Sequence, residues 1–106
     1  MAANIKEIIS KAGNYALDVK KIYPVDKAIL FGSYSKGYAT ENSDVDICFF
    51  LNNYNGKQRV EIIAELLGLG KNYPDLPIEP LVFETAEFVK GNPFVNEILK
   101  HGIDLL

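Results

Sequence analysis

A glycine–serine pair and two closely spaced acids are the residues of this sequence whose types and spacing could carry chemistry. Gly32-Ser33 is followed, after ten intervening residues, by Asp44-Val45-Asp46. Residues two apart in a β-strand point to the same face, so the two carboxylates would project together. Glycine lets the backbone pass close to a phosphate, and serine adds an N–H and a hydroxyl. The combination predicts chemistry on a nucleotide.

The acid pair predicts a site for divalent metal. In a strand the Cα atoms of Asp44 and Asp46 would lie about 6.6–6.8 Å apart. That spacing suits two metal ions about 3.5–4 Å apart, the arrangement used for in-line displacement at phosphorus. Two carboxylates in a dry site repel each other, so a cation is expected with them, and Mg²⁺ prefers oxygen ligands.

Two further charged residues complete the predicted site. Glu79 stands near the start of the third apolar run, from where it could complete the metal site or accept the proton of an attacking hydroxyl. Pro80 follows it directly and is expected to disturb the strand there. Lys36 is the one cation between Gly32 and Gly37, and it could meet the triphosphate of ATP or another nucleoside triphosphate.

The elements that must hold these residues are helices and strands in alternation. Strands are expected at 27–31, 44–51 and 78–83. The second is apolar on both faces after Asp46, which predicts a central position, and Pro80 places the third at an edge. Helices are expected from Asn4 to just before Tyr23-Pro24, from Asn55 to Gly68–Gly70, and from Asn92-Pro93 to Gly102, with short turns near Ser33 and from Thr85 through Lys90.

This order predicts an α/β (α+β) fold with a small mixed β-sheet flanked by helices, and residues 1–106 are expected to form a single domain. In the second helix, the predicted buried stripe consists of Val60, Ile63, Ala64 and Leu67. In the last helix, Phe94, Val95, Ile98 and Leu99 are expected to share a face, and His101 to stabilise the helix dipole at the C-terminus.

Composition excludes several classes of protein. The net charge of −3 and the scattered lysines argue against direct nucleic-acid binding. The longest apolar run is far short of a membrane span, so no membrane contact is expected. A single cysteine, Cys48, lies within an apolar run and cannot form an internal disulfide. We therefore expect a buried thiol and a cytoplasmic location.

These residues together resemble a known family. Gly32-Ser33, ten residues, then Asp44-Val45-Asp46 is similar to the signature of the DNA polymerase beta-type nucleotidyltransferases. The small size and the closing stretch 98–105 resemble the minimal nucleotidyltransferase (MNT) branch. The sequence differs from that pattern at Tyr34, where the family often has arginine, and at Glu79, where aspartate is usual.

The resemblance implies a fold, an activity and a partner. It implies a nucleotidyltransferase fold and an enzyme that transfers a nucleoside monophosphate from a nucleoside triphosphate to a hydroxyl. AMP from ATP is the transfer most expected, and the triphosphate is expected to be bound with two Mg²⁺ ions. Asp44, Asp46 and Glu79 match the catalytic, metal-binding acids, and Ser33 matches the triphosphate-binding serine. Many MNT relatives are antitoxins encoded beside a HEPN-domain ribonuclease toxin, and some attach AMP to a tyrosine of it.

Three functions follow from the sequence and its resemblance. The first is an enzyme that modifies a HEPN toxin as its antitoxin. The second is a binding antitoxin that neutralises its partner by contact alone. The third, ranked last, is a nucleotidyltransferase acting on a small molecule. Tyr34 and Tyr38 could stack on a base or simply pack, and the sequence leaves open whether the chain associates with itself or with another chain.

Overall fold

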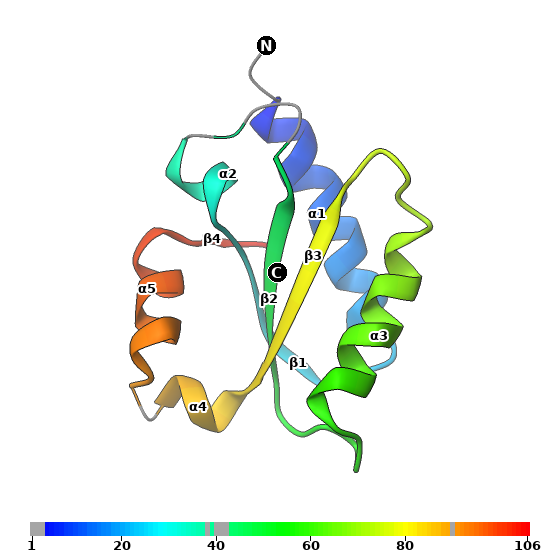
Figure 1. Cartoon of the computed structure of the whole chain (residues 1–106), viewed down its shortest axis with the longest axis vertical. Coiled ribbons are helices and arrows are strands. Elements are labelled where there is room, and N and C mark those ends of the chain that lie inside the picture. Colours follow the sequence, from blue (N-terminus) through cyan, green and yellow to red (C-terminus); the bar gives the residue numbers. More distant parts are fainter. Residues whose placement is uncertain (1–3, 38, 40–42, 90) are drawn as a thin grey trace.

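A four-stranded mixed sheet with helices against its faces forms the body of the computed structural model, which describes residues 4–37, 39, 43–89 and 91–106 (Figure 1). The predicted fold class is confirmed. The helices are α1 (Ile5–Lys20), α2 (Ser33–Lys36), α3 (Arg59–Gly70), α4 (Thr85–Val89) and α5 (Pro93–His101). The strands are β1 (Val25–Phe31), β2 (Val45–Leu51), β3 (Ile78–Glu84) and β4 (Ile103–Asp104). None of these helices, within the part of the chain that is described, is long and apolar enough to cross a membrane.

The strand order is β3-β2-β1-β4, which puts β2 in the interior of the sheet and β3 at an edge, as predicted. Strand β2 runs antiparallel to β1 and parallel to β3. The disturbance expected at Pro80 is absent, because the pairing of β2 with β3 continues unbroken from Val45–Ile78 to Leu51–Glu84. Proline is tolerated on an edge strand where its missing N–H would face away from the neighbour. The two-residue strand β4 was not predicted.

Strand β2 divides its side chains between two cores. Ile47, Phe49 and Leu51 enter the larger core, which α1 and α3 cover with residues such as Tyr15 and Leu66. The alternate residues Cys48 and Phe50 enter a smaller core on the opposite face, where Val95 and Ile98 of α5 cover the sheet. Asp46 precedes Cys48 by two positions, so its carboxylate belongs to the α5 face.

Two helix starts follow the predicted capping chemistry, and a third element begins near its predicted residue. The side chain of Asn4 accepts a hydrogen bond from the N–H of Glu7 at the start of α1. The side chain of Asn92 accepts from the N–H groups of Phe94 and Val95 at the start of α5. The helical turn α4 begins at Thr85 as predicted, and its expected end at Lys90 lies outside the described residues.

The prediction for α3 was wrong in its start and in its buried face. Asn55 and Gly56 adopt positive φ values of 54° and 78°, so they form a turn, and Gln58 and Glu61 form the capping box instead. The residues buried on α3 are Ile62 and Leu66, whereas of the predicted stripe Val60, Ala64 and Leu67 are exposed and Ile63 is half-buried. Apolar residues occur nearly all round this helix, so their periodicity does not fix which face is buried.

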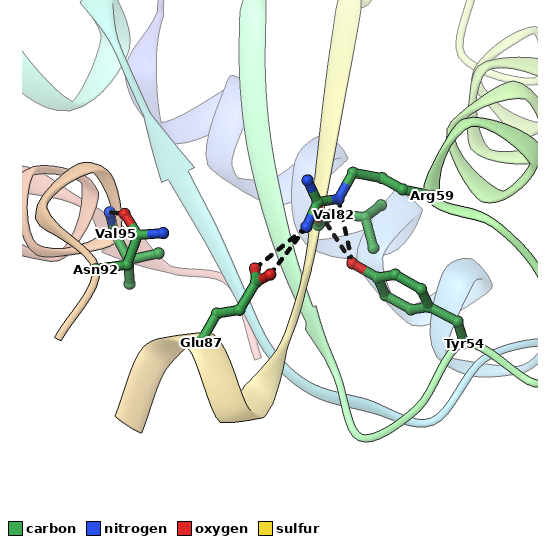
Figure 2. A network of polar contacts seen from close by, with 6 residues as sticks. All are labelled: Tyr54, Arg59, Val82, Glu87, Asn92 and Val95. Carbon is green, nitrogen blue, oxygen red and sulfur yellow. Dashed lines mark hydrogen bonds and ion pairs between the residues drawn. The ribbon is translucent and has the colours of Figure 1, made fainter. Parts of the chain in front are cut away.

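A polar network links the elements around the end of β2 (Figure 2). Arg59, the only arginine of the chain, donates to both carboxylate oxygens of Glu87 and to the hydroxyl of Tyr54. The Tyr54 hydroxyl in turn donates to the carbonyl oxygen of Val82 in β3, at 3.4 Å. The loop after β2, the start of α3, helix α4 and the edge strand β3 are thereby joined.

Candidate functional site

The three predicted acids lie at one end of the two strands β2 and β3. Asp46 is the second residue of β2, and its register partners are Phe31 of β1 and Glu79 of β3. Paired residues on adjacent strands project to the same face, so the Asp46 and Glu79 side chains share the α5 face of the sheet. Asp44 precedes β2 and is exposed, whereas Asp46 is half-buried. The structure thus places Asp46 beside Glu79, while Asp44, which was expected within the strand, lies just before it.

The pKa of Asp46 reflects both its burial and the two other acids. Burial raises the pKa of the Asp46 carboxyl above its usual range, and the negative charges of Asp44 and Glu79 raise it further. A partly buried carboxylate beside two more is a site of negative potential, and no cation among the described residues lowers the pKa of Asp46. Such a set of oxygen donors is the kind that Mg²⁺ prefers.

The fit to metal rests on donor chemistry rather than on a preformed cage. Among the residues that the structure describes, no group of three His, Cys, Asp or Glu side chains is gathered closely enough to hold a metal ion. The exposed Asp44 and Glu79 are free of the packing that fixes core side chains, so their carboxylates can turn toward a cation at Asp46. The identity of the three acids as ligands stays a prediction.

Gly32 is required by its contact with Asp46. Its φ of 74° and ψ of −145° lie in a region that side-chain-bearing residues rarely adopt. A Cβ built on Gly32 would lie 2.3 Å from Oδ2 of Asp46, inside the contact distance of the two atoms. The Asp46 carboxylate therefore packs directly against the Gly32 backbone, which joins the glycine–serine turn to the acid cluster.

The turn after Gly32 is a single helical turn, α2, as the sequence predicted near Ser33. The carbonyl oxygen of Gly32 accepts from the N–H of Lys36 at 3.2 Å and from Oγ of Ser35 at 3.0 Å. Gly37, in the left-handed region at a φ of 81°, ends the turn. These bonds hold Ser33 in a fixed position beside Gly32.

Lys36 and Tyr34 both make contacts with other parts of the chain. Nζ of Lys36 lies 4.0 Å from Oε1 of Glu97 in α5, so the lysine is directed toward that helix. Phosphate binding by Lys36 stays a prediction. Tyr34 is buried in the larger core and does not present its ring for stacking, and Tyr38 lies outside the described residues.

A cavity beside the turn was not found by sequence reasoning. It has a volume of about 250 Å³ and is lined on one side by Phe31, Gly32, Ser35 and Lys36, and on the other by Phe94, Glu97, Ile98 and His101 of α5. The sequence placed α5 correctly but gave no sign that it returns to the glycine–serine turn. A larger hollow of about 600 Å³ lies between α1 and Tyr73, and no predicted site residue lines it.

Known sequences are similar to this chain over most of its length. The family described as nucleotidyltransferase domain matches residues 14–105. The Methanocaldococcus jannaschii protein MJ0141, provisionally assigned as a protein adenylyltransferase, is 30% identical over 104 residues, which cover 93% of this chain and 99% of that protein. MJ1379 of the same organism, with the same provisional assignment, is 38% identical over 73 residues, covering 63% of this chain and 70% of that protein.

Solved structures share the fold. A crystal structure of a provisionally assigned nucleotidyltransferase from Sulfolobus solfataricus superposes with a TM-score of 0.64 at 14% identity, covering 94% of this chain and 80% of that one. A crystal structure of a toxin–antitoxin with AMP-PNP superposes with a TM-score of 0.58 at 20% identity, covering 89% of this chain and 72% of that one. At these identities the likeness establishes the fold alone.

Proposed function

This chain belongs to the nucleotidyltransferase domain family, and from that membership we propose that it is a Mg²⁺-dependent enzyme, folded as one catalytic domain, that transfers AMP from ATP to a hydroxyl of a protein partner. The observation that carries the proposal is the placement of Asp46 between the Gly32 backbone and Glu79. A phosphate-binding turn and a set of acids meet there at one end of the sheet.

Each residue has a role in the proposed reaction. Gly32 and Ser33 bind the triphosphate, and Asp44, Asp46 and Glu79 hold Mg²⁺. The acceptor oxygen forms a bond to the α-phosphorus, the bond from that phosphorus to the β-bridging oxygen breaks, and pyrophosphate leaves. Glu79 accepts the proton of the acceptor hydroxyl. Bound Mg²⁺ would supply positive charge to the phosphate oxygens as negative charge develops there.

The proposed partner is a HEPN-domain ribonuclease toxin, which the chain would silence as its antitoxin. Support for a protein acceptor comes from MJ0141 and MJ1379, which are provisionally assigned as protein adenylyltransferases. Support for a toxin comes from the toxin–antitoxin structure that shares the fold.

The test is transfer of label from ATP to a protein. Purified protein, Mg²⁺ and ATP labelled at the α-phosphate are mixed with lysate of the native host, and the proteins are separated by size. We expect a new labelled band that is absent with γ-labelled ATP and with Asp44→Asn. The band identifies the acceptor, and a HEPN-domain protein in it would support the partner that we propose.

A second candidate is neutralisation by contact alone, which the engagement of Lys36 by Glu97 favours because it leaves the turn without a free cation. The two candidates differ in one variant. Asp44→Asn abolishes protection from the toxin if transfer silences it, and leaves protection intact if contact is sufficient. Labelling of a small acceptor with no protein present would instead indicate a small-molecule nucleotidyltransferase.

A further inference from the structure

We propose that the cavity between α2 and α5 is the site of the nucleobase, and that Phe94 supplies an aromatic surface against which the base packs. This inference rests on the proposed function, since it assumes a triphosphate bound at Gly32–Ser33. It adds a binding site formed by α5, a helix to which no role in the reaction has been assigned above.

The position of the cavity relative to Gly32 distinguishes the base from the other reacting groups. Glu79, on β3, lies on one side of Asp46, and Phe31, on β1, lies on the other. The cavity is lined by Phe31 and Gly32 at the end of β1 and by α5, and Glu79 is not among its lining residues. An acceptor whose proton passes to Glu79 must reach that carboxylate, so the cavity is better suited to another part of the nucleotide.

The apolar part of the lining favours the nucleoside over the pyrophosphate. Three apolar side chains, Phe31, Phe94 and Ile98, form much of the wall, and Lys36, which also lines the cavity, is paired with the carboxylate of Glu97. A group carrying several negative charges gains nothing from an apolar wall. The remaining part of the nucleotide, the nucleoside, has the complementary character.

A nucleobase fits because it combines flat apolar faces with polar edges. Phe94 is 52% exposed, so a face of its ring is accessible, while its other contacts hold it near Phe83 at a centroid distance of 5.9 Å. Hydroxyl and carboxylate groups for the base edge are present on Ser35 and Glu97. Sites for small ligands typically consist of this mixture, an apolar lining with a few convergent polar groups.

Helix α5 is held firmly enough to serve as a wall. The ion pair between Lys36 and Glu97 spans from α2 to α5, and Ile98 is buried in the smaller core. At the end of the helix, Gly102 packs so closely on β1 that an added Cβ would clash with Cγ2 of Ile29. Figure 1 shows α2 and α5 on the same side of the sheet, next to the end of β1.

The test compares ATP with inorganic tripolyphosphate, which has the phosphates but no base. Binding of each compound in the presence of Mg²⁺ is measured by calorimetry for the wild type, Phe94→Ala and Phe94→Leu. We expect Phe94→Ala to weaken ATP binding by about 5- to 150-fold, the effect of removing one base–aromatic contact. Tripolyphosphate binding should stay within about twofold, and Phe94→Leu, which keeps the apolar packing, should weaken ATP by less.

Leu67→Ala is the matched control, because Leu67 is 47% exposed on α3 and lines no part of the cavity. It should change the binding of neither compound. Equal weakening of ATP and tripolyphosphate by Phe94→Ala, or unchanged ATP binding, would overturn the nucleobase site while leaving the proposed function standing. A wild type that binds tripolyphosphate as tightly as ATP would do the same. Failure of the wild type to bind either compound would overturn both.

Discussion

Replacing Gly32 by alanine is predicted to abolish most of the transfer activity while leaving the protein folded. The added Cβ would lie 2.3 Å from Oδ2 of Asp46 and 3.2 Å from its Cγ. The carboxylate is the far end of a flexible side chain, so it can turn away from the methyl group. Relief of the clash therefore moves the group that we propose as a metal ligand.

The size of the effect follows from that distance. Ordinary contact with a Cβ begins at 3.4 Å, so the carboxylate oxygen must retreat by about 1 Å, and displacements of that size in an active site cost about 100-fold in rate. The backbone contributes separately, because alanine at a φ of 74° is strained by about 1–3 kcal/mol. In a domain of this size, each 1 kcal/mol lowers Tm by roughly 4–8 °C.

Gly56→Ala separates the two contributions. Gly56 has nearly the same φ, 78°, but no atom lies within 4 Å of a Cβ built there, and it stands in the turn after β2. The assay is the single-turnover rate of AMP transfer from α-labelled ATP to the acceptor identified by labelling, together with Tm for each variant. We expect both variants to melt at lower temperature and Gly32→Ala alone to lose about 100-fold in rate.

One result would refute this reasoning. If Gly32→Ala is folded and transfers AMP within a few-fold of Gly56→Ala, then the position of the Asp46 carboxylate against the Gly32 backbone is not needed for the reaction. The role proposed for Asp46 would then have to be abandoned, and the family assignment would be unaffected.

The remaining predictions concern stability. The raised pKa of Asp46 means that the folded state holds the carboxyl proton more tightly than the unfolded state does, so stability falls as pH rises through the interval between the two pKa values. Asp46→Asn should therefore raise Tm at pH 7, and the gain should vanish at about pH 3 when thermal melts are measured across pH. Tyr15→Phe removes a buried hydrogen bond of 2.6 Å to the carbonyl oxygen of Leu66 and should cost about 1–3 kcal/mol in denaturant unfolding; an unchanged midpoint would contradict this. Gly102→Ala forces a Cβ against a backbone carbonyl of α5 at 2.6 Å and should lower the free energy of unfolding by about 1–3 kcal/mol. Gly13→Ala in α1, where the nearest contact of the added Cβ is 3.7 Å away, should be neutral or stabilising in the same experiment.

Most of the framework around the acids could be predicted from the sequence because its signals are local. Alternation of side chains along β2 placed Asp46 on one face, and Asn92-Pro93 marked the start of α5. The face of α3 could not be predicted, since apolar residues surround that helix and only the packing of Ile62 and Leu66 on the sheet selects one side.

The candidate site shows the same difference between local signals and contacts that depend on the fold. The sequence singled out three acids as candidates, but the pairing of Asp46 with Glu79 depends on a parallel register between strands that are distant in sequence. The ion pair of Lys36 with Glu97 and the cavity beside it depend on where α5 returns to the sheet. Neither contact has a signal within a short window of residues.

The edge strand β3 is poorly suited to accept another strand. Pro80 lacks the N–H that a neighbouring chain would use, and the Val82 carbonyl already accepts from the Tyr54 hydroxyl (Figure 2). Two successive outward-facing positions are thus unavailable for pairing, which protects an otherwise open sheet from edge-to-edge aggregation. It also limits how a partner can dock: a protein that delivers its hydroxyl beside Glu79 must present it from a loop or a helix, because an extended segment would find no continuous ladder along β3.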